Sequence, residues 1–243
     1  MTMRSSRIST QPPNTQWFSL MVCWALPNFG SRVDGYPPYI TGSGSIEQRA
    51  EKLAEHIAKN AKGKNVNIIA HSMGGLDARY MISHLQPKNV AVHSLVTVAS
   101  PHHGSAFADY LFEQIGTERL PSIYKFVEGI GMDTGAFQQL TRRYMAEEFN
   151  PRVPDDPAVR YFSYGATTDP PPLLSPFRQT HRVITQDEGP NDGLVSVASS
   201  KWGTYKGTLV GVSHLDLINV SKPSRLPSCS LQRGDQKDPR HFV

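Results

Sequence analysis

The chain has 243 residues, of which 38% are hydrophobic and 19% are charged, and its formal net charge is +4. These values are typical of one folded domain with a sizeable core, and they exclude a disordered chain, a coiled coil and a collagen-like repeat. No apolar run reaches the ~20 residues that a membrane-spanning helix needs. No run of like charges indicates nucleic-acid binding, so nucleic acid is not an expected partner.

Residues 1–40 form an atypical N-terminal segment. The first part is polar and basic, with no acidic residue before Asp34, a composition shared by mitochondrial transit peptides and by a disordered or misassigned start. The apolar stretch 17–26 has no clear secretory cleavage site, and we expect it to form a strand or a buried segment. Cys23 and Cys229 predict neither a disulfide framework nor a metal site. An intracellular location, with mitochondria included, is therefore the expectation.

The first clear helix is predicted from Ser45, which forms a capping box with Gln48. Apolar residues then recur at helical spacing, and Gly63 follows where a terminating glycine is favoured. The β-branched run 65–70 predicts a buried strand, residues 76–85 a second helix and residues 90–99 another strand. This alternation predicts a parallel sheet.

The second half of the chain contains weaker patterns. Residues 105–150 have scattered apolar residues interrupted by glycines and a proline, which is typical of broken helices. Further strands are predicted at 159–164 and 208–212. Residues 221–243 are polar, basic and broken by prolines, and we expect them to form a disordered tail.

The segment Ala70-His71-Ser72-Met73-Gly74 has the A-x-S-x-G form of a nucleophile elbow between a predicted strand and a predicted helix. Small residues two positions before and after the serine permit a strained turn, which lifts the Ser72 hydroxyl above the sheet edge. The turn also aims the Met73 backbone N–H toward a developing oxyanion. Gly75 leaves room for the helix to pack closely. The alternative to a nucleophile elbow is that Ser72 lies in an ordinary turn and only caps the helix that follows.

A nucleophilic serine needs a general base and an acid that orients the base. His214 directly follows the predicted strand 208–212, which is the place and chain order expected for the base. For the acid, Asp192 lies in the turn segment PNDGLV, before His214 in the chain, and Asp187 and Glu188 are close competitors. The alternative for Asp192 is a β-turn without a catalytic role.

Four segments, AHSMGGLDARY, VTVASPHHGSAFAD, GPNDGLVSVASSKWG and GVSHLDLIN, together resemble the triacylglycerol lipase branch of the α/β-hydrolases. This branch includes bacterial true lipases and a group of fungal intracellular lipases. A fifth segment, GSGSIEQRAEKL, resembles the lead into the helix before the nucleophile strand, so the resemblance covers about residues 41–220. It implies an α/β-hydrolase fold, which is a mostly parallel sheet flanked by helices, with residues 105–150 as a helical lid over an acyl-chain pocket. It also implies Ser72 as nucleophile, Asp192 as acid and His214 as base.

The chain departs from the family pattern at both ends. Family members begin with a strand that ends in His-Gly, whose loop supplies a second oxyanion N–H, and residues 1–40 contain no such dipeptide. The family's last helix also has no counterpart in residues 221–243, so we expect the fold to be incomplete at both ends. Asp216 matches a calcium-ligand position of bacterial relatives, but no partner carboxylate is identified. No cofactor is therefore expected, and calcium is kept as an alternative.

The sequence thus predicts a serine hydrolase that cleaves carboxylic esters of lipids through an acyl-enzyme. Triacylglycerols are the expected substrates, met at a lipid–water interface or peripherally at a membrane surface. Two alternatives stay open, namely a lipid acyltransferase with the same triad and a non-catalytic remnant that binds lipid or a partner.

Overall fold

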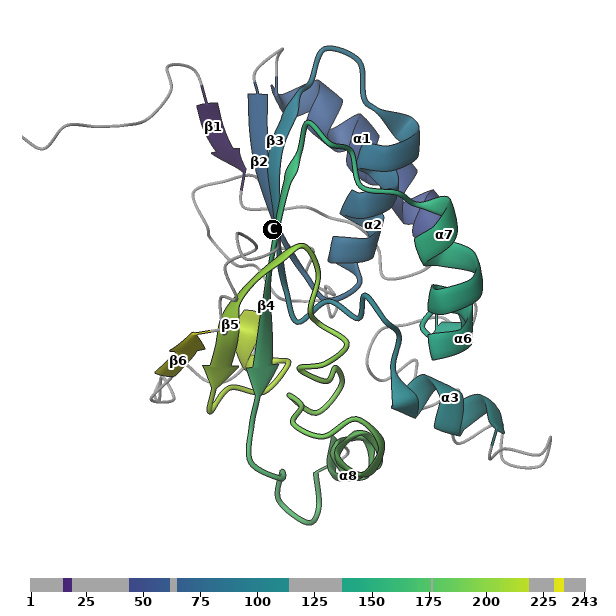
Figure 1. Cartoon of the computed structure of the whole chain (residues 1–243), viewed down its shortest axis with the longest axis vertical. Helices are drawn as coiled ribbons and strands as arrows, with labels where there is room; N and C mark the ends of the chain where they lie inside the picture. Colours follow the sequence, from purple (N-terminus) through teal and green to yellow (C-terminus); the bar gives the residue numbers. More distant parts are fainter. Residues whose placement is uncertain are drawn as a thin grey trace, which may run out of the picture.

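A β-sheet forms the centre of the molecule in this computed structural model, which describes residues 15–18, 44–61, 65–113, 137–175, 177–218 and 230–233. Within these residues the sheet has six strands in the order β1-β2-β3-β4-β5-β6 (Figure 1). The first five strands run parallel, and β6 pairs antiparallel with β5. The strands are β1 (Thr15–Phe18), β2 (Asn65–His71), β3 (Val92–Val98), β4 (Arg160–Thr167), β5 (Thr204–Val210) and β6 (Ser230–Arg233).

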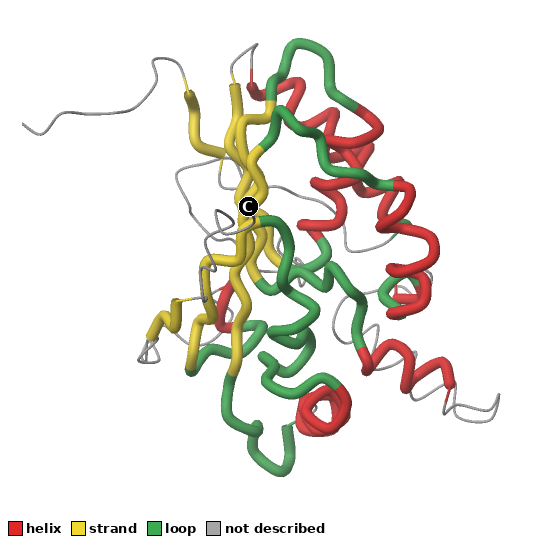
Figure 2. The backbone as a smooth tube through the Cα atoms, in the orientation of Figure 1, coloured by secondary structure: helices red, strands yellow, loops and turns green. Residues whose placement is uncertain are grey.

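Helices follow the first strands and cover one side of the sheet, where Figure 2 shows α1, α2, α6 and α7 together. A π-helical turn, η1, continues α2, so the two form one longer helical segment. No described helix is long and apolar enough to cross a lipid bilayer. The helical elements are α1 (Ile46–Ala61), α2 (Gly74–Tyr80), η1 (Met81–Leu85), α3 (Ala106–Glu113), α6 (Arg142–Tyr144), η2 (Met145–Phe149), α7 (Asn150–Arg152), α8 (Phe177–Asp187) and η3 (Asp216–Ile218).

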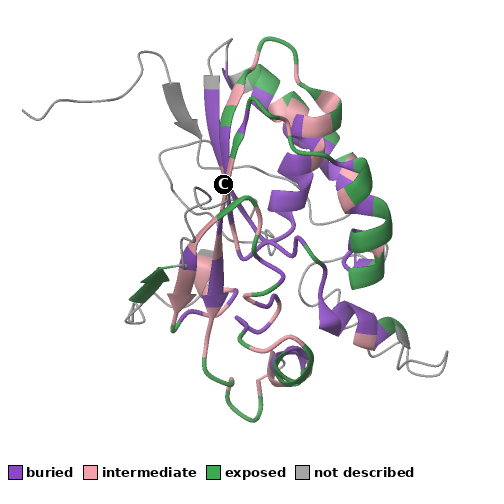
Figure 3. Cartoon of the chain, viewed as in Figure 1, coloured by how far each residue is buried: buried purple, intermediate pink, exposed green. Residues whose placement is uncertain are grey.

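The start of α1 is fixed by the predicted capping box. The Gln48 N–H donates to Ser45 Oγ at 3.3 Å, and the Ser45 N–H donates to Gln48 Oε1 at 3.1 Å. A buried ion pair then joins α1 to α2, because Arg49 donates to both carboxylate oxygens of Asp77 at 3.0 and 2.7 Å. The ion pair ties α2, which follows the Ser72 segment, to α1, and α2 itself is buried (Figure 3).

The interrupted region 105–150 is partly described. Its first helix is α3, and its last part contains α6, η2 and the start of α7, while residues 114–136 lie outside the described residues. Phe107 of α3 is buried in a core cluster that also contains Met73 and Leu76. Phe112, on the same helix, is about half exposed.

The predicted disorder of residues 221–243 is wrong for four of them. Ser230–Arg233 form β6, whose backbone pairs with β5 from Gly207 to Val210. All four side chains are exposed, so the strand is held by backbone hydrogen bonds and has no hydrophobic pattern that would reveal it.

At the opposite edge, β1 pairs in parallel with β2, from Thr15 beside Asn65 to Phe18 beside Ile68. The strand therefore lies slightly before the apolar stretch 17–26 and overlaps its first two residues. Residues 19–43 lie outside the described residues.

Other predicted strands have shifted bounds, since β3 spans Val92–Val98 and not 90–99, and one helix was not predicted. β4 extends to Thr167, and β5 begins at Thr204, earlier than the apolar run 208–212 suggested. The start of β5 lacks an apolar pattern, since Thr204 is exposed and the next two residues are half buried. α8 was missed because its sequence is polar and directly follows a cluster of prolines, which favours a loop.

Candidate active site

Ser72 occupies a strained turn between β2 and α2. Its φ is +55°, in the left-handed region that residues other than glycine seldom adopt. Hydrogen bonds on both sides hold this conformation, since the Ser72 N–H donates to Val98 O at 3.0 Å and the Gly75 N–H donates to Ser72 O at 3.1 Å. This is the backbone geometry of a nucleophile elbow.

The small residues around the serine occupy tightly packed positions. Ala70 is fully buried at the end of β2, and Gly74 opens α2. A Cβ on Gly75 would lie 2.2 Å from Ser100 Oγ, which is far inside van der Waals contact. The close approach of α2 to the loop after β3 therefore requires a glycine at position 75.

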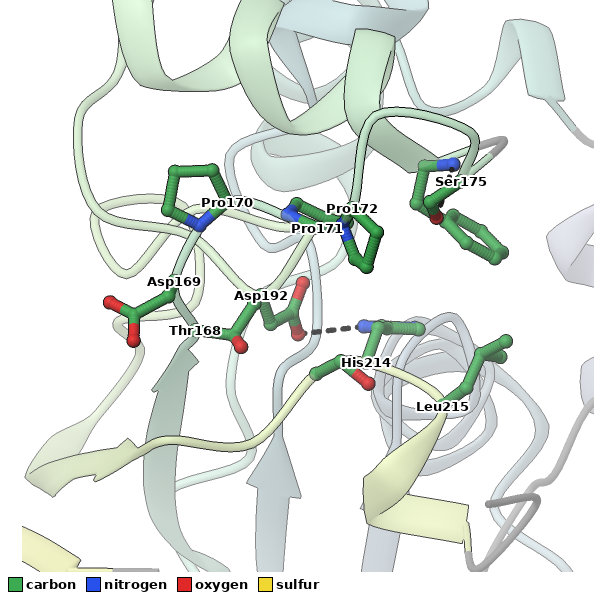
Figure 4. Close-up of a pocket in the computed structure, with 11 residues that line it drawn as sticks. Thr168, Asp169, Pro170, Pro171, Pro172, Ser175, Asp192, His214 and Leu215 are labelled. Carbon is green, nitrogen blue, oxygen red and sulfur yellow. Dashed lines mark hydrogen bonds and ion pairs between the residues drawn. The ribbon is translucent and has the colours of Figure 1, made fainter. Parts of the chain in front are cut away.

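A continuous chain of hydrogen bonds links the three residues predicted to form a triad. His214 Nε2 lies 2.9 Å from Ser72 Oγ, and His214 Nδ1 lies 2.7 Å from Asp192 Oδ2. Figure 4 shows the bond between Asp192 and His214. The three residues come from the β2–α2 turn, the loop after α8 and the loop after β5, and none is more than 5% exposed. With the proton on Nδ1, Nε2 is free to accept the serine proton.

The Asp192 carboxylate is held in place by its own turn. Asp192 Oδ1 accepts hydrogen bonds from the N–H groups of Leu194 at 3.0 Å and Val195 at 2.8 Å. The Asp192 carbonyl accepts from the His214 N–H at 2.9 Å, so backbone and side chain bind the two loops together. These contacts leave Oδ2 aimed at the imidazole.

The competing acids are engaged elsewhere. Asp187, whose side chain is 51% exposed, pairs with Arg142 at 2.7 Å. Glu188 Oε1 accepts a hydrogen bond from the Ala106 N–H at 2.5 Å, and Oε2 accepts one from the Ser196 hydroxyl. The structure therefore brings only Asp192, of the three acids considered, to His214.

The Met73 backbone N–H stands at the first turn of α2, next to Ser72. Within the described part of the chain, no acceptor is assigned to this N–H, so it is available to an incoming oxyanion. Residues 19–43, which follow β1 and belong to the segment where a second donor was sought, lie outside the described residues.

A second buried histidine, His71, lies beside His214. The His71 ring centroid is 4.4 Å from that of His214, and neither ring nitrogen of His71 has a hydrogen-bond partner among the described residues. Burial, and secondarily the nearby His214, hold the pKa of His71 well below its ordinary value. The ring is therefore neutral and adds no positive charge next to the base.

A cavity of about 290 Å³ adjoins Asp192 and His214. It lies between the loop 168–175, Phe177 at the start of α8, and the loop 213–215 (Figure 4). The lining is mixed, with three consecutive prolines, a phenylalanine and a leucine beside hydroxyl and carboxylate groups. Sequence reasoning missed this cavity, although the proline cluster and the position of His214 were its two signals.

Asp216 bonds within its own loop. Its Oδ2 accepts hydrogen bonds from the Ser213 N–H at 2.9 Å and the Ser213 hydroxyl at 2.6 Å. In the part of the chain that the structure describes, there is no group of three or more side chains suited to holding a metal ion. The contacts of Asp216 with Ser213 support the loop that carries His214.

Comparison with known proteins agrees with this geometry. A family model described as "Domain of unknown function (DUF7379)" matches residues 25–115. The Triacylglycerol lipase 2 of Saccharomyces cerevisiae is 40% identical over 74% of this chain and 56% of its own length. The Triacylglycerol lipase of Pseudomonas fragi is 27% identical over 80% of this chain and 79% of its own length. The chain thus spans only about half the length of its yeast relative.

Solved structures share the architecture. The mature Bacillus licheniformis lipase BlEst2 superposes with a TM-score of 0.59 and 21% identity, covering 72% of this chain and 69% of that one. The Staphylococcus hyicus lipase superposes with a TM-score of 0.57 and 18% identity, covering 88% of this chain and 91% of that one. The fold and the elbow define an α/β-hydrolase, as the sequence predicted. Within that superfamily, the chain is similar to the yeast and bacterial triacylglycerol lipases named above.

Proposed function

We propose that the chain is a serine hydrolase that cleaves carboxylic esters of lipids, with triacylglycerols as the substrate class. The observation that carries the proposal is the chain of hydrogen bonds from Asp192 through His214 to Ser72, with the serine on a strained elbow. The name triacylglycerol lipase, printed for the yeast and bacterial relatives, supports the choice of substrate.

The proposed reaction proceeds in two halves. His214 Nε2 takes the Ser72 proton while Oγ forms a bond to the ester carbonyl carbon, and the Met73 N–H stabilises the resulting oxyanion. As this intermediate collapses, the bond to the leaving alcohol breaks and His214 gives it the proton. Water then attacks the acyl-enzyme by the same route, which releases the fatty acid and returns the proton to Ser72. Asp192 orients the imidazole and stabilises its cation throughout.

Three further elements belong to the proposal. His214 performs each proton transfer, and the proposed reaction uses no cofactor. Residues 105–150 act as a lid over the acyl chain, and the half-exposed Phe112 on α3 contributes to its apolar surface. The protein acts at a lipid–water interface inside the cell.

The experiment that tests the function is ester turnover by Ser72→Ala beside a matched control. Ser83→Ala makes the same chemical change at a partly buried serine in η1, at the far end of the same helical segment. We expect Ser72→Ala to abolish hydrolysis of both a soluble butyrate ester and emulsified triolein, and Ser83→Ala to retain it. Wild-type turnover by Ser72→Ala would refute the proposal. Acyl transfer to an added alcohol in preference to water would identify an acyltransferase instead.

A further inference from the structure

Two leucines project from a tight turn beside the active site. The Ser175 N–H donates to Pro172 O at 2.9 Å, which closes a β-turn with Leu173 and Leu174 at its two central positions. Leu173 and Leu174 are 83% and 98% exposed, and no other large apolar residue in the described part of the chain exceeds 50%. Single exposed leucines are ordinary on protein surfaces, but two consecutive ones at the tip of a turn form a small apolar knob.

Prolines and hydrogen bonds from α8 brace the turn. Three consecutive prolines, Pro170 to Pro172, restrict the backbone that leads into it. Arg178 Nη1 donates to Pro171 O at 2.5 Å, and the Arg178 N–H donates to Ser175 O at 3.1 Å, so the first turns of α8 brace the loop. Because the turn is braced in this way, it loses little conformational entropy when Leu173 and Leu174 become buried on binding.

The same loop forms a wall of the cavity next to the base. Pro170, Pro171 and Pro172 lie on one side of that cavity, and His214 and Leu215 lie on the other (Figure 4). Contact of the leucines with a surface would therefore bring the mouth of the cavity, and with it the base, close to that surface.

We propose that the turn containing Leu173 and Leu174 inserts into the surface of an uncharged lipid phase, such as an acylglycerol droplet, and anchors the active site there. Two leucine side chains present far less apolar area than the ~800 Å² that each partner buries in a standard protein interface. A lipid surface needs no complementary pocket and can accept a convex apolar knob of any size. Asp169 and Arg178 place opposite charges beside the turn, so it has no excess of positive charge that would select an anionic membrane. This inference rests on the proposed function for its biological sense, but the binding that it describes needs no catalysis.

Flotation with triolein droplets coated with phosphatidylcholine tests the anchor. The full chain carries Ser72→Ala, so that no substrate is consumed, and is compared with and without Leu173→Ser plus Leu174→Ser. We expect the double change to lower the partition coefficient by at least about tenfold, since burying one leucine side chain alone accounts for that factor. Leu231→Ser, the same change at a leucine that is 50% exposed on β6, should leave flotation unchanged. High salt should also leave it unchanged, because the contact is apolar.

Each outcome has a distinct meaning. On the otherwise native chain, the double change should preserve turnover of a soluble butyrate ester and the melting temperature while it reduces turnover of triolein. If the double variant floats like its parent, the anchor does not exist. If wild type is a dimer that the double change dissociates without altering flotation, the knob is a self-association contact and the proposal is wrong. If wild type turns over no ester but the difference in flotation remains, the proposed function fails and the anchor stands.

Discussion

Replacing Asp192 with asparagine tests how the acid positions the base. The amide oxygen can still accept the hydrogen bonds that Leu194 and Val195 donate to Oδ1, so the turn should keep its shape. The amide nitrogen then takes the place of Oδ2, 2.7 Å from His214 Nδ1, and donates a hydrogen bond to it. The imidazole proton is forced onto Nε2, which can no longer accept the proton of Ser72.

The expected loss follows from this change of tautomer and from the missing negative charge. We expect kcat to fall by about 10⁴, the loss known for an acid-to-amide change in a Ser-His-Asp triad, which corresponds to about 5.5 kcal/mol in the activation free energy. The assay is steady-state hydrolysis of a soluble butyrate ester near neutral pH, accompanied by thermal melts to show that the variant is folded.

Asp187→Asn is the matched control, since it makes the same substitution on a neighbouring acid that pairs with Arg142 at the surface. It should leave kcat close to that of wild type. An Asp192→Asn enzyme that is folded and retains wild-type kcat would refute the role of this acid. An equal loss in Asp187→Asn would show that the loop as a whole, and not the bond to His214, determines activity.

Two predictions concern stability. Gly75→Ala would place a Cβ 2.2 Å from Ser100 Oγ, so we expect urea unfolding to show a free energy of unfolding lower by about 1–3 kcal/mol. A variant as stable as wild type would contradict the close packing of α2 at this position. Burial holds the pKa values of His71 and His102 well below the ordinary 6.5, so the unfolded chain binds protons below that pH while the folded chain does not. Below pH 6.5, each histidine should therefore lower the free energy of unfolding by about 1.4 kcal/mol per pH unit. In His71→Phe, the free energy of unfolding should fall less steeply with decreasing pH than in wild type. An unchanged pH dependence would show that His71 is protonated in the folded chain.

The central part of the site could be predicted because its requirements are local. The elbow needs small residues at fixed spacing around Ser72, and the base and acid follow from chain order and from their places after structural elements. The choice of Asp192 over its two neighbours was harder, because it depends on which carboxylate the turn at Leu194 and Val195 directs toward His214.

Other features depend on contacts between distant segments. β6 has only exposed side chains, and its existence follows from backbone pairing with β5, which a hydrophobicity pattern does not record. His71 belongs to the elbow segment that the sequence revealed. Its position beside His214, without a hydrogen-bond partner among the described residues, follows only from packing. The cavity combines the loops 168–175 and 213–215, which are adjacent only after the sheet has formed.

Covalent labelling tests the central claim, that Ser72 is an activated nucleophile, most directly. The folded wild-type chain is treated with a fluorophosphonate, digested and mapped by mass spectrometry. We predict one phosphonyl adduct, located on the peptide that contains Ser72, because His214 Nε2 lies 2.9 Å from its hydroxyl and can remove the proton as the phosphorus bond forms. An unlabelled folded chain, or an adduct on a different serine with Ser72 unmodified, would contradict the account.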